Sequence, residues 1–156
     1  MTLATARSLV CSVVLLGALG PARALHAQIG VGTWVRTAPG SAVAMTMKVE
    51  ACCKGGRRLI YHFDINGTET LLALESRFDG SEAEVMIGGK PSGETMAITR
   101  VDDHHLSTIV KLNGKAFGTS KATLSPDGKV LTVLNDFSSS AGGTPAGEFT
   151  ETWVRK

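Results

Sequence analysis

Short runs of alternating apolar and polar residues recur along the chain from residue 31 onward. Alternation with a period of two is typical of a β-strand with one buried face, and no run here carries a convincing helical period. We therefore predict ten strands, at 31–37, 43–51, 58–65, 68–78, 83–87, 94–101, 105–112, 115–124, 129–137 and 147–155. Closely spaced strands joined by hairpins indicate an all-β sandwich or up-and-down barrel.

One hairpin can be predicted down to its register. Asn66-Gly67 favours a two-residue type I′ turn, which fixes the residues that face each other. The pairs on one, strongly apolar face are Ile65 with Thr68, Phe63 with Thr70, Tyr61 with Leu72, and Leu59 with Leu74. The other face places Arg58 opposite Glu75. A slip of one residue would move every side chain to the opposite face.

A second turn, Asn113-Gly114, predicts Val110 opposite Phe117 and Thr108 opposite Thr119. The other face of this hairpin carries Ala116, Gly118, Ser120 and Ala122. Small residues on an inward face leave room for a ligand. They equally suit a face that another segment covers closely, and the sequence leaves both alternatives open.

Residues 1–27 have the pattern of a cleaved signal peptide. Arg7 supplies the positive charge, and 9–19 is an apolar run well short of the ~20 residues that cross a bilayer. Small residues place the cleavage after Ala24 or after Ala27. We expect a secreted or periplasmic protein with one domain, 28–156, and no membrane span.

Removing this segment changes the charge balance. The chain has 16 basic and 14 acidic residues, and the segment holds Arg7 and Arg23 but no acidic residue. The remaining domain therefore carries no net charge when histidine is neutral. A neutral domain gives no reason to expect nucleic acid as a partner.

Cys52 and Cys53 are neighbours in the sequence. Adjacent Cα atoms lie ~3.8 Å apart, below the usual disulfide range of ~4.4–6.8 Å. The open alternatives are two free thiols, a strained vicinal disulfide, an intermolecular bridge, and a metal or redox role. None of these alternatives links distant parts of the same domain, so the domain must be held by its core.

The chain lacks the motifs of catalytic and cofactor sites. It has no Gly-X-Ser-X-Gly elbow, phosphate loop, dinucleotide fingerprint or zinc-type Cys/His spacing. The cluster Asp102 to His105 is interpreted as a polar hairpin turn, because adjacent histidines in a strand point to opposite faces. We expect no enzyme, no metal site and no cofactor.

Two short motifs frame the domain: Gly32-Thr33-Trp34 near its start and Trp153-Val154-Arg155 near its end. This pair resembles the calycin pattern of lipocalins and fatty-acid-binding proteins. The resemblance implies a single antiparallel barrel of about 8–10 strands, in which Trp34 plugs one end and Arg155 packs across it. With Asp127-Gly128-Lys129, the chain also resembles small exported bacterial proteins described as lipocalin-like.

Fatty-acid-binding proteins carry an arginine two residues before the final aromatic residue, where it binds the carboxylate. This chain has Glu151 at that place, which would repel a fatty acid. Strand parity puts Glu151 on the side of Phe149 and Trp153, so it needs a partner. That partner is an inward arginine such as Arg100, or a polar or cationic ligand.

We therefore predict a binding protein that holds a small, partly apolar molecule. The predicted ligand-binding residues are Met45, Met47, Tyr61, Phe63, Leu72, Leu74, Arg100 and Glu151. The alternative is a filled barrel that acts through its rim, as an envelope structural protein or an inhibitor. A cavity of a few hundred Å³ favours the first function, and a solid core favours the second.

Overall fold

The computed structural model describes residues 29–37, 44–65, 67–139 and 146–156, so the predicted signal peptide lies outside the described residues. Ten strands fill most of this chain. They are β1 (Gly32–Arg36), β2 (Met45–Cys52), β3 (Gly56–Ile65), β4 (Thr68–Ser76), β5 (Asp79–Ile87), β6 (Lys90–Arg100), β7 (His105–Leu112), β8 (Lys115–Leu124), β9 (Val130–Phe137) and β10 (Gly147–Arg155). The predicted all-β class and the ten predicted strands are confirmed.

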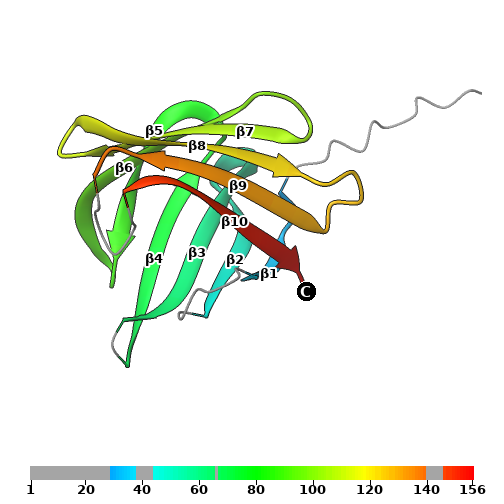
Figure 1. Ribbon diagram of the computed structural model, residues 1–156, viewed down its shortest axis with the longest axis horizontal. Helices are drawn as coiled ribbons and strands as arrows, with labels where there is room; N and C mark the ends of the chain where they lie inside the picture. Colours follow the sequence, from blue (N-terminus) through cyan, green and yellow to red (C-terminus); the bar gives the residue numbers. More distant parts are fainter. Residues whose placement is uncertain (1–28, 38–43, 66, 140–145) are drawn as a thin grey trace, which may run out of the picture.

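The strands form one closed, antiparallel up-and-down barrel (Figure 1). Each strand pairs with the next along the chain, and β1 pairs with β10 to close the sheet. Besides a single 3₁₀ turn, Cys53–Gly55, the described residues contain no helix. None of them therefore forms a helix that could cross a membrane.

The register of the β3–β4 hairpin agrees with the sequence-based prediction at every pair. Tyr61 faces Leu72, Leu59 faces Leu74, and Arg58 faces Glu75. The side chain of Asp64 holds the turn, since its Oδ1 accepts a hydrogen bond of 2.6 Å from the backbone N–H of Gly67. The Asn-Gly turn thus fixes the register along the whole β3–β4 hairpin.

The β7–β8 register differs from the prediction. Val110 pairs with Gly118 and Thr108 with Ser120, because a β-bulge lies between Val110 and Lys111. The bulge gives β8 one extra residue, Phe117, and shifts all later pairs by one position. The predicted pairs of Val110 with Phe117 and of Thr108 with Thr119 are therefore wrong.

Two strands, β5 and β6, begin four residues earlier than predicted. The turn before β5 is made by Phe78, at φ 60, whose side chain is buried in the core, so Asp79 already belongs to the strand. Gly88 and Gly89, both at positive φ, make a tight turn that lets β6 begin at Lys90. Glycine adopts positive φ without a steric penalty, so a longer loop is unnecessary.

Large apolar side chains fill one end of the barrel, which we term the closed end. Its buried cluster includes Trp34, Val49, Leu59, Leu74, Phe78, Leu124, Leu131 and Trp153. Trp34 is completely buried. Burying large side chains in this way stabilises each by about 1.5–3 kcal/mol relative to exposure.

Arg155 lies opposite Trp34 in the β1–β10 ladder. Its Nη2 donates a hydrogen bond of 2.6 Å to the carbonyl of Val31. A Cβ atom at Gly30 or Gly32 would lie 2.9 or 3.2 Å from the guanidinium, so these glycines leave space for it. The glycine of the Gly-X-Trp motif thus serves the close approach of Arg155 to the β1 backbone.

We predict that Trp34→Ala lowers the free energy of unfolding by about 3–5 kcal/mol, because it leaves a large void in the closed end. Denaturant titration measures this change. The control is Val101→Ala, at a side chain 64% exposed, which should change the free energy by less than about 0.5 kcal/mol. A loss below about 1 kcal/mol for Trp34→Ala would contradict its role as the plug.

Candidate functional site

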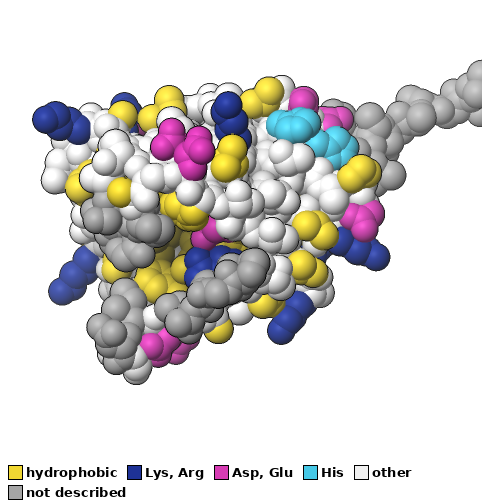
Figure 2. All heavy atoms as spheres, in the orientation of Figure 1, with side chains coloured by type: hydrophobic (Ala, Val, Ile, Leu, Met, Phe, Trp, Pro, Cys, Tyr) yellow, Lys and Arg dark blue, Asp and Glu magenta, His cyan; other side chains and the backbone are white. Residues whose placement is uncertain are grey.

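The barrel holds a cavity of ≈ 470 Å³ beyond the closed end. Met47, Leu59 and Trp153 belong both to the buried cluster and to the cavity lining, so the closed end forms the cavity floor. Figure 2 shows one hollowed face, with hydrophobic side chains in the hollow and basic and acidic atoms among them. The interior is therefore hollow and partly apolar.

Small side chains on β8 explain why space remains. The β-bulge turns Ser120 and Ala122 toward the interior, where both line the cavity. At Gly118 the ring of Phe137 takes the place of a side chain, since a Cβ atom there would lie 2.0 Å from the ring. Phe137 also stacks on Phe149, with ring centroids 5.8 Å apart. Aromatic rings thus cover one part of the wall, while small residues leave the centre open.

Six of the eight residues predicted to bind ligand line this cavity: Met45, Met47, Tyr61, Phe63, Leu72 and Glu151. Leu74 does not line it, although its cross-strand partner Leu59 does; Leu74 is buried within the apolar cluster. Arg100 does not line it either. This arginine ends β6 and forms an ion pair with Asp103 in the adjoining turn.

Glu151 forms an ion pair with Arg36 inside the cavity. Nη1 of Arg36 lies 2.8 Å from Oε1 of Glu151, and the two side chains are 14% and 21% exposed. The sequence suggested Arg100 as the partner of Glu151, but the partner is Arg36. Strand parity could have identified Arg36, since it lies two residues after Trp34 and therefore on the same face of β1.

Tyr61 lies beside this ion pair. Its ring packs edge-on against Trp153, with centroids 5.8 Å apart. Burial raises the pKa of the Tyr61 hydroxyl well above its usual value, and the negative charge of Glu151 raises it further. The hydroxyl is therefore neutral at physiological pH.

A second polar spot lies elsewhere on the wall, where sequence reasoning had assigned no site. Ser120 and Asn135 both line the cavity, and Oγ of Ser120 donates a hydrogen bond of 2.6 Å to Oδ1 of Asn135. Asn135 is buried, at 5% exposure. An asparagine at an inward position of an otherwise apolar β9 face was the signal for it. The cavity thus combines apolar walls with two separate polar groups that could orient a bound molecule.

Comparisons with known proteins support the fold. The structure is similar to the fluorescent protein UnaG, with a TM-score of 0.56 to a crystal structure of a mutant and 0.51 to the wild type. Identity is 16% in both cases, and the matches cover 82% and 81% of this chain and 96% of each UnaG chain. This chain therefore shares the β-barrel fold of that protein. No protein-family model and no curated protein sequence matches the chain.

We predict that Tyr61 resists ionisation in the folded protein. The chain has one tyrosine, so the ultraviolet absorbance of tyrosinate reports on this residue alone. At about pH 11 the native protein should show little tyrosinate, whereas the denatured protein should be largely ionised, because the ordinary pKa is about 10.

The same shift links folding to pH. Because the pKa is raised in the folded state, its contribution to stability is complete below about pH 10 and is lost as the pH rises through the folded pKa. Glu151→Gln should lower the pKa of Tyr61 by removing the nearby negative charge. Native tyrosinate appearing near pH 10 in the wild-type protein would show that Tyr61 is not shielded from water.

Proposed function

We propose that this chain is an exported binding protein that holds a small, uncharged amphipathic molecule inside its barrel and releases it unaltered. The observation that carries this proposal is the hollow interior, ≈ 470 Å³ in volume, with an Arg36–Glu151 ion pair in an apolar wall. Export rests on the signal-peptide pattern of residues 1–27.

The size and lining of the cavity support a small ligand. Pockets for small molecules usually measure about 300–1,000 Å³ and are mostly apolar, with a few polar groups that fix orientation. Met45, Phe63 and Leu72 offer apolar contact, and apolar burial contributes about 25 cal/mol per Å². A filled barrel that acts through its rim would have no use for such a space, so this alternative is less favoured.

The ion pair argues for an uncharged ligand. Arg36 and Glu151 neutralise each other, and the other charged residue of the described lining is the exposed Asp64, so the cavity does not attract a carboxylate. A ligand carboxylate would have to displace Glu151 from Arg36. Glu151 would then lack its partner in a partly dry environment, which is costly. A neutral molecule with hydrogen-bonding groups can contact the pair without breaking it.

We predict that the neutral dye Nile red binds in the cavity with a rise in its fluorescence. Ala122→Phe should weaken this binding at least about tenfold, a change of about 1.4 kcal/mol, because the ring enters the cavity. The matched control is Thr123→Phe, at the exposed neighbouring position, which should leave the affinity unchanged. Equal affinities for the two variants would place the dye elsewhere.

We further predict that Glu151→Gln converts the cavity into one that accepts carboxylates. Without the charge of Glu151 opposite it, Arg36 can donate a charge-assisted hydrogen bond to a ligand carboxylate, worth about 1.5–3 kcal/mol. A dansyl-labelled fatty acid should bind about 10–100-fold more tightly than to the wild-type protein, as measured by its fluorescence. Nile red should change much less, since it carries no charge.

Two controls test the cause of this gain. Glu148→Gln removes an exposed carboxylate from the same strand, so it should not improve fatty-acid binding. The double variant Arg36→Gln with Glu151→Gln should lose the gain, because the cation is gone. A wild-type protein that binds the labelled fatty acid as tightly as the Glu151→Gln variant would refute the selectivity for uncharged ligands.

A further inference from the structure

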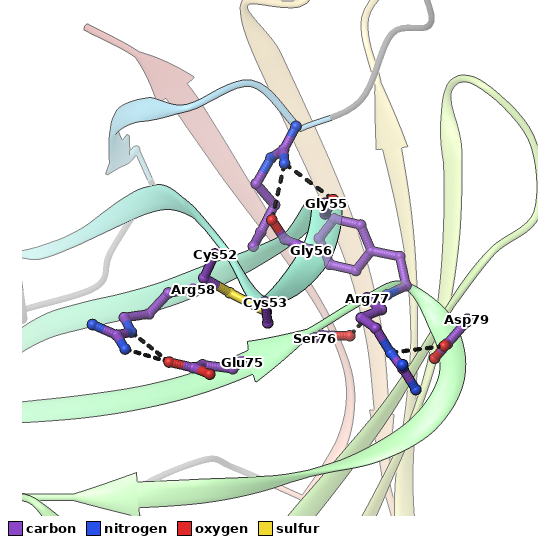
Figure 3. The surroundings of a disulfide bond; sticks show 11 residues. Cys52, Cys53, Gly55, Gly56, Arg58, Glu75, Ser76, Arg77 and Asp79 are labelled. Atoms are coloured by element: carbon purple, nitrogen blue, oxygen red, sulfur yellow. Dashed lines mark hydrogen bonds and ion pairs between the residues drawn. A yellow bond between two sulfur atoms is a disulfide. The ribbon is translucent and has the colours of Figure 1, made fainter.

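Cys52 and Cys53 form a disulfide on the outside of the barrel (Figure 3). Cys52 ends β2, and Cys53 begins the 3₁₀ turn that leads into β3. Neither cysteine lines the cavity. The pair therefore has no part in the ligand site proposed above and calls for an explanation of its own.

The turn brings both sulfur atoms to one side of the sheet. Adjacent residues of a regular strand point to opposite faces. Cys53 and Lys54 leave the strand conformation, with φ values of 40 and 53. At Gly56 a Cβ atom would lie 2.8 Å from Sγ of Cys53, so the glycine leaves room for this sulfur against β3.

Glu75 on β4 completes the group. One ligand atom from each of Cys52, Cys53 and Glu75 lies within 4.8 Å of the others. Figure 3 shows Glu75 beside the two sulfurs, with Arg58 between β2 and β4. Two thiolates and a carboxylate are a donor set that suits Zn²⁺ and similar thiophilic ions.

We propose that Cys52, Cys53 and Glu75 form a redox-gated site for a thiophilic divalent cation. The disulfide closes the site, because its sulfur atoms are bonded to each other. A dithiol reductant opens it by transferring two electrons and two protons to the sulfurs, and is itself oxidised to a disulfide. The cation then binds both sulfurs and releases their two protons.

The surroundings of the site favour this opening. Arg58 pairs with Glu75, with Nε 2.8 Å from Oε1, but the two side chains are 49% and 46% exposed. An exposed pair of this kind is weak, so a divalent cation can take the carboxylate from the arginine. The adjacent Lys54 also stabilises thiolates, which then face the cation together with Glu75.

Cadmium provides a direct test with the full chain. After reduction by a phosphine reductant, titration with Cd²⁺ should produce thiolate-to-metal absorbance that saturates at one ion per chain. Zn²⁺ should compete for the same site. Oxidised protein should give no such absorbance. Absorbance of equal strength in the oxidised protein would overturn the proposal.

Variants identify the three ligands. Cys52→Ser and Cys53→Ser should each abolish the signal, and Glu75→Gln should weaken Cd²⁺ binding at least about tenfold. The matched control is Glu69→Gln, an exposed carboxylate of the same strand paired with His62, which should bind Cd²⁺ like the wild type. Arg58→Gln should bind about two- to fivefold more tightly, because Glu75 is released.

Two measurements keep the test independent of folding. Nile red binding should persist in every variant, since the site lies outside the cavity. Alkylation of the reduced wild-type protein blocks both thiols without a substitution and should also abolish Cd²⁺ binding. Cadmium binding that survives alkylation, or equal affinities for Glu75→Gln and Glu69→Gln, would refute the site.

Discussion

Closure of the sheet between β1 and β10 is the constraint on which the rest of this structure depends. These strands lie at opposite ends of the described chain, yet they form one antiparallel ladder. Side-chain and backbone contacts beyond the ladder also join the same two segments. Arg36 pairs with Glu151, Arg155 donates to Val31, and Thr37 donates its backbone N–H to Thr152. Without this ladder, β1 and β10 would each expose an edge, and the interior would open to water.

Closure also divides the interior into two parts with different roles. Trp34 on β1 and Trp153 on β10 are both buried and help to fill the closed end. Farther along the barrel, the small residues Ser120 and Ala122 leave the cavity open. Stability therefore comes mainly from the filled part, and the hollow part is free to hold a molecule. A sheet whose large and small side chains were evenly mixed could not separate these two tasks.

The sequence predicted whatever depends on neighbouring residues. All ten strands and the β3–β4 register follow from alternation and from the Asn-Gly turn, which act over a few residues. The Asn113-Gly114 turn predicts the β7–β8 hairpin, but it does not predict the register, because the β-bulge beyond the turn has no clear sequence signal. This bulge decides which face of β8 lines the cavity.

Predictions of individual site residues failed where they needed distances along the barrel. Parity places Leu74 inside correctly, but it does not say that this residue is buried in the apolar cluster while its partner Leu59 reaches the cavity. Strand parity makes Arg36 an inward candidate, but choosing it over Arg100 as the partner of Glu151 requires the closure that brings residues 115 positions apart together. Asn135 was overlooked because its partner Ser120 depends on the shifted register.

The Arg36–Glu151 pair is the strongest argument that the interior serves recognition. Removing two charges from water costs several kcal/mol for each ion, and replacing such a pair with apolar residues is often neutral or stabilising. The pair is largely shielded, so a barrel built for stability alone would be better served by apolar side chains at these positions. Polar groups held inside an apolar wall instead fix how a guest is oriented and which guests are rejected. In the binding function proposed above, glutamate opposite Arg36 balances the charge of the arginine and disfavours a carboxylate guest.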